Sequence, residues 1–455
     1  MQKILLFIAS LFYFNSLFAK NEIKSWQGIH ETPLSRLEQQ FADPPVEFAN
    51  HVIWGWEGKM DKKTICNDLD SIKKKGFRAV IFEAGYKLPF KYLSEEWFKA
   101  IRTGVLEAKK RGMKVWIIDE GKYPSGFAGG KFSQERPDLR MQALVIGDTI
   151  QIKRGEVMTN HKIAPEIISA VAVSTSGAPN RTVAINNGEI SFNAGLDDWK
   201  ILLVKSDFRT AVTRAVNNPN GGKDATNSLC DYLNPVAVQQ FIDWTHEQYK
   251  KYLGKELGTT VLGFRGDEPD YAHLPWTPSI VQTFKDTKGY DPTPYLASFF
   301  TTSPTIQEQR VKADYWDVWS SLFATHFFKL QADWCAANGV AHITHLNKEH
   351  EMPACVKAEG DYFRNLSKVQ IPGVDAIWNQ IWPGTLNDFP KLASSVAHVY
   401  GKPRAFSESF AAYHISPTIP QAKFVVDHQI ARGINFFEFM FWPAGSKHRN
   451  WMSDP

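Results

Sequence analysis

Acidic residues follow several short apolar runs of this chain, at positions where β-strands are expected to end. Glu268 comes directly after Asp267 and the run 261–266, and Glu408 follows the run 404–407. Two carboxyl groups can cleave a glycosidic bond if one protonates the leaving oxygen and the other acts as base or nucleophile across the sugar. The sequence therefore offers Glu268 and Glu408 as the candidate catalytic pair.

Further polar and aromatic residues stand near the expected strand ends, where they could bind sugar hydroxyls or stack on sugar rings. The candidates for substrate binding are Trp56, Glu83, Asp119, Glu120, Tyr123, Asp267, His345, Asn347, Trp378, Gln380, Tyr413, Glu438 and Trp442. Neighbouring residues of a strand point to opposite sides, so only one of Asp119 and Glu120 can face a barrel axis, to bind hydroxyls or hold the next loop. For each tryptophan, a sugar platform and an ordinary core position both stay open.

The elements that would position these residues alternate between short apolar strands and amphipathic helices, which indicates a parallel sheet. The expected strands are 51–56, 78–83, 113–119, 261–266, 341–345, 374–378, 404–407 and 434–441. Eight strands, each but the last followed by helical sequence, predict an α/β fold of the (β/α)8 TIM-barrel type, with the active site at the carboxyl ends of the strands. Between strands three and four, β-type runs with Gly and Asn turns predict a small inserted β-rich domain.

These patterns divide the chain into five segments. We expect a signal peptide at 1–19, an N-terminal segment at 20–45, a first barrel part at 46–136, an inserted β domain at 137–215 and a second barrel part at 216–455. The signal peptide is indicated by Lys3, the apolar run 4–14 and the small residue Ala19 at the cleavage point. It predicts a secreted or periplasmic protein with no membrane span after cleavage; an uncleaved N-terminal anchor is the alternative.

The sequence after the last expected strand is short. Only fourteen residues follow Phe441, too few for an eighth helix of normal length with its loop. We therefore expect either that the segment 19–43 closes the barrel instead or that the chain is a fragment of a longer protein.

Composition excludes some functions. With 52 Lys and Arg against 48 Asp and Glu, the net charge is only +4 and no basic stripe marks a nucleic-acid partner. Four cysteines in 455 residues do not make a disulfide framework, and unpaired buried thiols are the simplest interpretation, although a pairing of Cys335 with Cys355 stays open. The aromatic content of 13%, with 15 Trp, suits a protein that stacks sugar rings.

Several short motifs also carry a resemblance to a known family. They lie at 54–56, 119–126, 232–235, 245–247, 266–269, 397–402 and 407–410. Together they resemble glycoside hydrolase family 106, the α-L-rhamnosidase-like enzymes among the (β/α)8-barrel glycosidases. The resemblance implies cleavage of an α-L-rhamnoside-like bond in oligo- or polysaccharides with inversion, with Glu268 as general acid and Glu408 as general base. It also implies a calcium ion near the site with unidentified ligands, whereas the residues themselves require no cofactor.

Two other functions remain as alternatives. A carbohydrate-binding barrel without catalysis would use the same aromatic rim, but it would not need two carboxylates on opposite sides. A metal-dependent amidohydrolase would need a His-x-His pair at the end of the first strand, where His51 stands alone. His342 and His345 are expected to face opposite sides of one strand and so cannot share a metal. The segment 349–351 is expected to be a solvated, charged loop.

Overall fold

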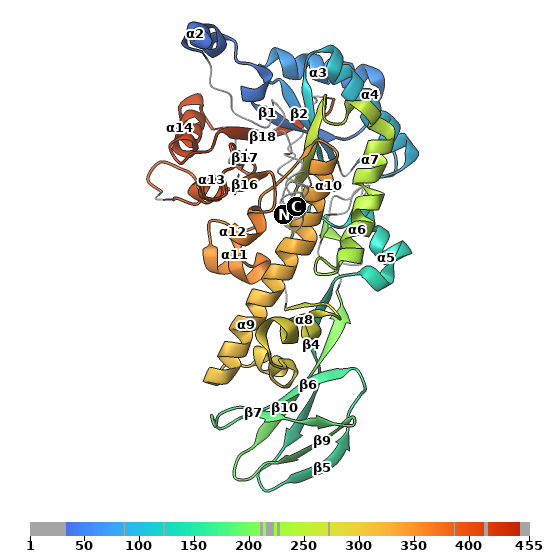
Figure 1. Cartoon of the computed structure of the whole chain (residues 1–455), viewed down its shortest axis with the longest axis vertical. Helices are drawn as coiled ribbons and strands as arrows, with labels where there is room; N and C mark the ends of the chain where they lie inside the picture. The colour runs from blue at the N-terminus through green and yellow to red at the C-terminus, as the bar shows by residue number, and fades with distance from the viewer. Residues whose placement is uncertain are drawn as a thin grey trace, which may run out of the picture.

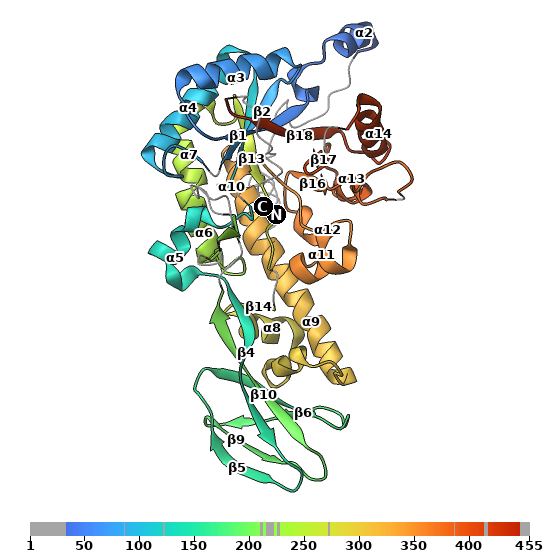
Figure 2. The same cartoon turned by 180° about the vertical axis from the view of Figure 1, so that it is seen from behind.

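The computed structural model describes residues 33–85, 87–121, 123–209, 213–214, 223–224, 228–271, 274–385, 387–413 and 417–445. Eight parallel strands close into a barrel in the order β1-β18-β17-β16-β15-β13-β3-β2, with helices around it (Figures 1 and 2), which confirms the predicted (β/α)8 barrel. The barrel strands are β1 (His51–Trp56), β2 (Ala79–Ala84), β3 (Lys114–Ile118), β13 (Val261–Gly266), β15 (Ala341–Thr344), β16 (Ile371–Ala376), β17 (Phe406–Ser409) and β18 (Phe436–Pro443). The predicted signal peptide lies outside the described residues.

The predicted position of the sixth strand is wrong. Strand β16 begins at Ile371 and ends at Ala376, so Trp378 lies in the loop beyond it. The start of this strand is hard to recognise in the sequence because it contains Pro372 and Gly373. Proline cannot donate a hydrogen bond to the sheet, and glycine has no side chain to pack. Gly373 is needed there because a Cβ atom on it would lie 2.1 Å from the ring of Phe406 inside the barrel.

Helices lie around the barrel (Figure 1). Those described are α2 (Leu34–Ala42), η1 (Val46–Phe48), α3 (Lys62–Lys74), α4 (Glu95–Lys110), η2 (Ala128–Gly130), α5 (Lys131–Glu135), η3 (Pro137–Leu139), α6 (Pro235–Trp244), α7 (His246–Leu253), η4 (Gly254–Glu256), α8 (Ile280–Lys288), η5 (Thr293–Phe300), α9 (Ile306–Leu322), η6 (Phe323–Phe328), α10 (Lys329–Ala337), α11 (Met352–Glu359), α12 (Tyr362–Leu366), α13 (Pro390–Val399) and α14 (Ile419–Ile430). Ser94 caps α4, its hydroxyl accepting a hydrogen bond from the N–H of Trp97. None of the described helices is both long and apolar enough to cross a membrane.

Helix α2 does not serve as an eighth barrel helix. It has no buried residue, and Leu34 and Phe41 are largely exposed on its surface. It projects at one end of the molecule, away from the barrel wall (Figure 1). The described part of the segment 19–43 therefore does not support the expectation that this segment closes the barrel.

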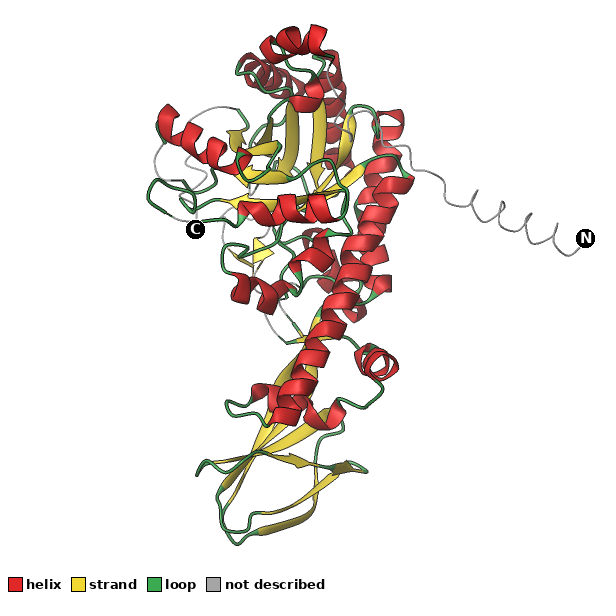
Figure 3. Ribbon diagram, turned by 60° about the vertical axis from the view of Figure 1, so that its left-hand side comes forward, coloured by secondary structure: helices red, strands yellow, loops and turns green. Residues whose placement is uncertain are grey.

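A small β-rich part lies between β3 and β13 in the chain and projects from the barrel at the opposite end of the molecule (Figure 3). Its sheets contain β4 (Gln142–Ile152), β5 (Val157–Lys162), β6 (Ile167–Ser174), β7 (Arg181–Val183), β8 (Ile185–Asn186), β9 (Glu189–Asn193), β10 (Trp199–Phe208) and β14 (Pro275–Trp276), and β11 (Thr213–Arg214) pairs with β12 (Lys223–Asp224). The sequence did not indicate that β14, from after β13, joins the edge of β4.

The barrel interior is divided into an apolar layer and a polar layer. The apolar layer includes Ile81, Ile343, Phe406 and Phe436, which are buried in one cluster. Because side chains alternate along a strand, the residue two positions later on the same strand also points inward. Those residues are Glu83, His345, Glu408 and Glu438, so the alternation alone places polar groups at the carboxyl-terminal mouth.

We expect Gly263→Ala to lower the free energy of unfolding by about 3 kcal/mol, because overpacking against backbone cannot be relieved by a rotamer change. A Cβ atom at this position would lie 2.0 Å from the carbonyl oxygen of Ala341 on the neighbouring strand β15. Urea denaturation would measure the loss. Gly147→Ala is the control, since its Cβ atom would meet flexible side-chain atoms of Lys205 at 3.1 Å. Equal stabilities of the two variants would contradict this account of the barrel wall.

Candidate active site

The guanidinium group of Arg265, at the carboxyl-terminal end of β13, lies at the centre of the polar layer. It is fully buried and forms ion pairs with three carboxylates. Its Nη1 atom lies 2.9 Å from Asp267 Oδ1, its Nε atom 3.2 Å from Glu438 Oε2, and its Nη2 atom donates to Glu408 Oε2. Arg265 therefore holds Glu408 in a fixed position by a charge-assisted hydrogen bond.

His345 joins two of these carboxylates to the arginine. Its Nε2 atom lies 2.8 Å from Arg265 Nη2 and 3.4 Å from both Asp267 Oδ1 and Glu408 Oε2. Its Nδ1 atom lies 2.9 Å from the carbonyl oxygen of Leu346. Burial and the positive charge of Arg265 lower the pKa of His345, but its contacts with Asp267 and Glu408 outweigh both and raise that pKa well above the usual value. The ring is therefore fixed in orientation and surrounded by negative charge.

Glu268 follows Asp267 at the same mouth and has a different environment from Glu408. Burial raises its pKa to about 8, with further contributions from the negative charges of Asp267, Glu349 and Glu408. At neutral pH the carboxyl group is thus mostly protonated and can give up a proton. Its backbone has a φ of 40°, which is unusual outside glycine and places the side chain on a sharp turn after β13.

Asp375, on the inner side of β16, completes the cluster. One carboxylate oxygen of Asp375, one of Glu268 and one ring nitrogen of His345 all lie within 4.8 Å of one another. Burial raises the pKa of Asp375 well above its usual value, and the charges of Glu408 and Glu268 raise it further. The sequence alone left a buried ion pair and a substrate contact equally open for Asp375. Correct placement of the start of β16 would have shown that it faces inward.

Of the predicted site residues, the structure brings Glu268, Glu408, Asp267, His345 and Glu438 together around Arg265. Glu83 is buried in the same layer on β2. Glu349 is a further member that sequence reasoning missed, because the expectation of a solvated loop at 349–351 is wrong for it. Its side chain is buried, its Oε1 atom accepts a hydrogen bond from the N–H of Leu346, and burial raises its pKa to about 7.

Three predicted residues hold loops or belong to the core. Trp56 has no exposed surface and points to the outer face of the wall, where it packs against Trp97 of α4. Trp442 packs against the same outer core. Because Gly55 occupies the inward position between Trp54 and Trp56, the core interpretation holds for Trp56. Glu120 accepts N–H groups of Gly121, Ala128 and Gly129, so its carboxylate orders the loop after β3.

The remaining predicted residues lie around the mouth. Asp119 accepts a hydrogen bond from the Ser125 hydroxyl, and Tyr123 is half-buried on the same loop. Gln380 accepts the N–H of Ile377, and the Tyr413 hydroxyl donates to the carbonyl oxygen of Ile381, so both side chains order the loop after β16. Asn347 is half-buried after β15. Trp378 is 66% exposed, and the platform interpretation stays a prediction for it.

The donor atoms of the site do not suit the calcium ion that the family resemblance implies. Two groups of three residues bring candidate ligand atoms within 4.8 Å: Asp267, His345 and Glu408, and Glu268, His345 and Asp375. Both groups contain the His345 nitrogen, whereas calcium takes six to eight oxygen ligands. In the first group Arg265 already neutralises both carboxylates.

Comparison with known proteins adds to this geometry. A family model described as alpha-L-rhamnosidase, of glycoside hydrolase family 106, matches residues 158–441. A curated protein of Formosa agariphila named "Putative beta-glucuronidase" is 24% identical over 496 residues, covering 96% of this chain and 40% of that protein. A solved rhamnosidase from Novosphingobium sp. PP1Y has the same fold, with a TM-score of 0.68 and 15% identity over 92% of this chain and 57% of that one. The chain thus spans less than two thirds of the length of either protein.

The raised pKa values predict that the protein loses stability as the pH rises from 6.5 to 8.5. Burial first of all raises the pKa of Glu349 and Glu438 to about 7 and of Glu120 and Glu268 to about 8. In this range the folded state binds more protons than the unfolded state, whose carboxyls titrate near pH 4, so the free energy of unfolding falls by up to about 1.4 kcal/mol per pH unit for each proton. Urea denaturation across this range would measure the decline.

Glu268→Gln should make this decline shallower, because the amide does not titrate. Glu135→Gln is the control, since the Glu135 side chain is 49% exposed on α5. A free energy of unfolding that rises between pH 6.5 and 8.5 would contradict the assignment of protonated carboxyls to the folded site.

Proposed function

This chain belongs to the alpha-L-rhamnosidase family of glycoside hydrolases, and on that premise we propose that it hydrolyses an α-L-rhamnoside-like bond in oligo- or polysaccharides, with Glu268 as general acid and Glu408 as general base. One observation carries the assignment of roles. The two carboxyl groups share one mouth, but Glu268 has a pKa raised to about 8 whereas Glu408 is paired with the guanidinium of Arg265. Carboxyl groups in such different environments suit opposite roles in acid–base catalysis.

The proposed reaction uses these two groups in one step. The protonated Glu268 gives its proton to the glycosidic oxygen as the bond to the anomeric carbon breaks. Glu408 takes a proton from a water molecule that attacks the anomeric carbon from the opposite face, which inverts its configuration. Arg265 and His345 act as positioning residues, because their contacts hold the carboxylate of Glu408 in one position. The exposed Trp378 is suited to stack on a sugar ring beside the mouth.

The charges of the site favour a neutral sugar over a glucuronide. A uronic acid carries a carboxylate that needs a cation, but the guanidinium of Arg265 already pairs with Asp267, Glu408 and Glu438. Further carboxylates at the mouth would repel a bound anion. Rhamnose has a methyl group in the corresponding position and is not repelled. The β-glucuronide suggested by the name of the Formosa relative is therefore used in the test as a competing substrate, and the α-L-rhamnoside is the proposed substrate.

We further propose that the protein acts outside the cytoplasm. Support comes from the residues 1–19, where Lys3, an apolar run and a small residue at the cleavage point make a secretory signal.

The roles of the two glutamates are tested with Glu268→Gln and Glu408→Gln. On a rhamnose disaccharide, whose leaving group needs protonation, both variants should lose kcat/KM by roughly 10³-fold or more, since either loss removes stabilisation felt only in the transition state. On 4-nitrophenyl α-L-rhamnoside, whose leaving group needs no proton, Glu268→Gln should regain most of its turnover while Glu408→Gln stays inactive. Glu135→Gln is the matched control at an exposed position.

Three other results would change the proposed roles, the proposed substrate or the proposed function. The reverse pattern of rescue would exchange the two roles. Release of 4-nitrophenol from the β-D-glucuronide and not from the α-L-rhamnoside would overturn the substrate class. Rhamnoside binding in calorimetry without any turnover would favour the alternative of a carbohydrate-binding barrel without catalysis.

The pH profile of the wild type gives an independent check of the acid. Glu268 must be protonated to act, so kcat/KM on the disaccharide should fall above about pH 8, where burial and neighbouring charges place the pKa of this group. The basic limb should disappear in Glu268→Gln assayed on the 4-nitrophenyl substrate, where no proton is needed. If that limb persisted unchanged in the variant, a different group would set it.

A further inference from the structure

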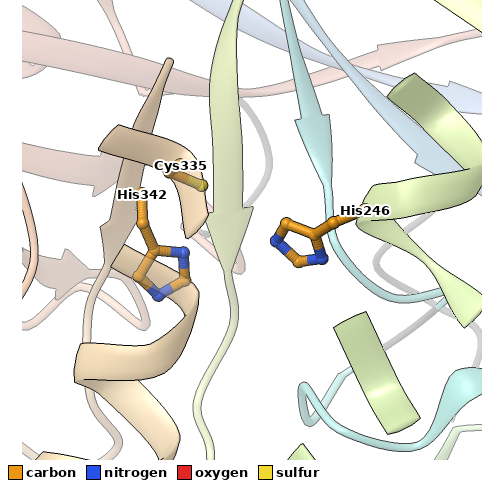
Figure 4. Close-up of side chains that lie close together, drawn as sticks. All are labelled: His246, Cys335 and His342. Atoms are coloured by element: carbon orange, nitrogen blue, oxygen red, sulfur yellow. The ribbon is translucent and has the colours of Figure 1, made fainter. Parts of the chain in front are cut away.

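A second buried cluster, formed by His246, Cys335 and His342, lies on the outer face of the barrel wall. The candidate ligand atoms of the three side chains all lie within 4.8 Å of one another, and none of the residues is more than 1% exposed. His342 comes from β15 and Cys335 from α10, and the ring of His246, the first residue of α7, points toward them from the other side (Figure 4). The mechanism proposed above uses none of these groups.

The hydrogen bonds of His246 leave one ring nitrogen with a free lone pair. The hydroxyl of Thr245 donates its single proton to the carbonyl oxygen of Phe241 at 2.7 Å. The same hydroxyl lies 2.9 Å from His246 Nδ1, and must therefore accept a hydrogen bond from the Nδ1–H group. The neutral ring then carries its lone pair on Nε2, which is buried and has no hydrogen-bond partner. Such a second contact is the usual way in which a metal-binding imidazole is oriented.

His342 has fewer hydrogen bonds than His246. Both of its ring nitrogens are buried without a hydrogen-bond partner. Burial lowers the pKa of His342 to about 3, and burial together with the neighbouring His342 holds the pKa of His246 well below its usual value. Both rings are thus neutral at physiological pH. Buried nitrogen atoms without a partner are costly, so a group that binds them would stabilise the fold.

The surroundings indicate which ligand fits. Two imidazoles and one thiol suit a transition metal, and the cluster contains no carboxylate for a hard cation. A thiolate with two neutral imidazoles neutralises a monovalent ion, whereas a divalent ion would leave a net positive charge and would call for a fourth ligand. The rings of Phe264 and Trp334 lie 4.2 and 5.1 Å from that of His246, and a net charge among such apolar walls is unfavourable.

We propose that His246 Nε2, Cys335 Sγ and one ring nitrogen of His342 bind a single Cu⁺ ion. Binding replaces the thiol proton of Cys335, which leaves to solvent, so the site is neutral before and after. Three ligands with bonds of about 2.0–2.3 Å stand on the order of 3.6 Å apart, so side-chain shifts of roughly 1 Å close the site. The ion joins α7 to the consecutive elements α10 and β15, and therefore ties the wall behind the active site together.

The test uses the full chain, freed of metal and kept reduced. Titration with Cu⁺ under anaerobic conditions against a chromophoric Cu⁺ chelator should show one tightly bound equivalent, and the ion should raise the Tm by roughly 3 °C or more. Cys335→Ser and His342→Gln should each lose this equivalent. Cys355→Ser, which removes another buried free thiol, should keep it. Because the variants could fail to fold, X-ray absorption of the wild-type complex is the second measurement, and should show one sulfur and two nitrogen neighbours.

Three results would overturn the proposal. They are a Cu⁺ stoichiometry that Cys335→Ser and His342→Gln leave unchanged, an absorption spectrum without a sulfur neighbour, and retention of Zn²⁺ by a protein that does not retain Cu⁺. Because the readouts are binding and thermal stability, these results are independent of whether the chain hydrolyses a rhamnoside.

Discussion

The site depends on the buried positive charge of Arg265. The guanidinium of Arg265 has no exposed surface and pairs with Asp267, Glu408 and Glu438. A charge in that position is tolerated only with such partners, since an unpaired ion in the protein interior costs several kcal/mol. The carboxylates also need the arginine, because each of their negative charges would be buried without compensation if the arginine were absent. The positions of the arginine and of Glu408 are consequently fixed together.

The carboxyl groups outnumber the positive charges at this mouth, and the excess explains the proposed acid. Once Arg265 has paired with three carboxylates, it leaves little compensation for Glu268, Asp375 and Glu349. These groups avoid the cost of buried negative charge by keeping their protons, and their pKa values are accordingly raised. The proton on Glu268 is thus a consequence of how charge is distributed over the whole cluster.

The sequence alone was sufficient for the barrel and for most of the polar residues at the carboxyl ends of its strands. Apolar runs of the right length alternate with amphipathic helices, and the inward–outward period of two carries Glu408 and Glu438 into the same layer. It was insufficient where a residue's role depends on neighbours from other strands. Arg265 stands close to Glu268 in sequence but pairs with β17 and β18, whose proximity exists only in the closed barrel. Glu349 was similarly hidden, because its charged neighbours in sequence are exposed whereas it is buried.

The histidines of the segment 341–345 show how completely environment decides chemistry in this fold. His342 and His345 are three residues apart and leave opposite faces of the wall formed by β13 and β15. His345 faces carboxylates, which raise its pKa, whereas His342 faces a thiol and apolar rings, and burial lowers its pKa to about 3. One face of the wall can therefore stabilise the charges that acid–base chemistry requires, while the other keeps its nitrogens neutral and available as ligands. Since β15 carries His342 and leads directly into His345, an ion bound on the outer face would stiffen the end of the strand that holds His345 in place.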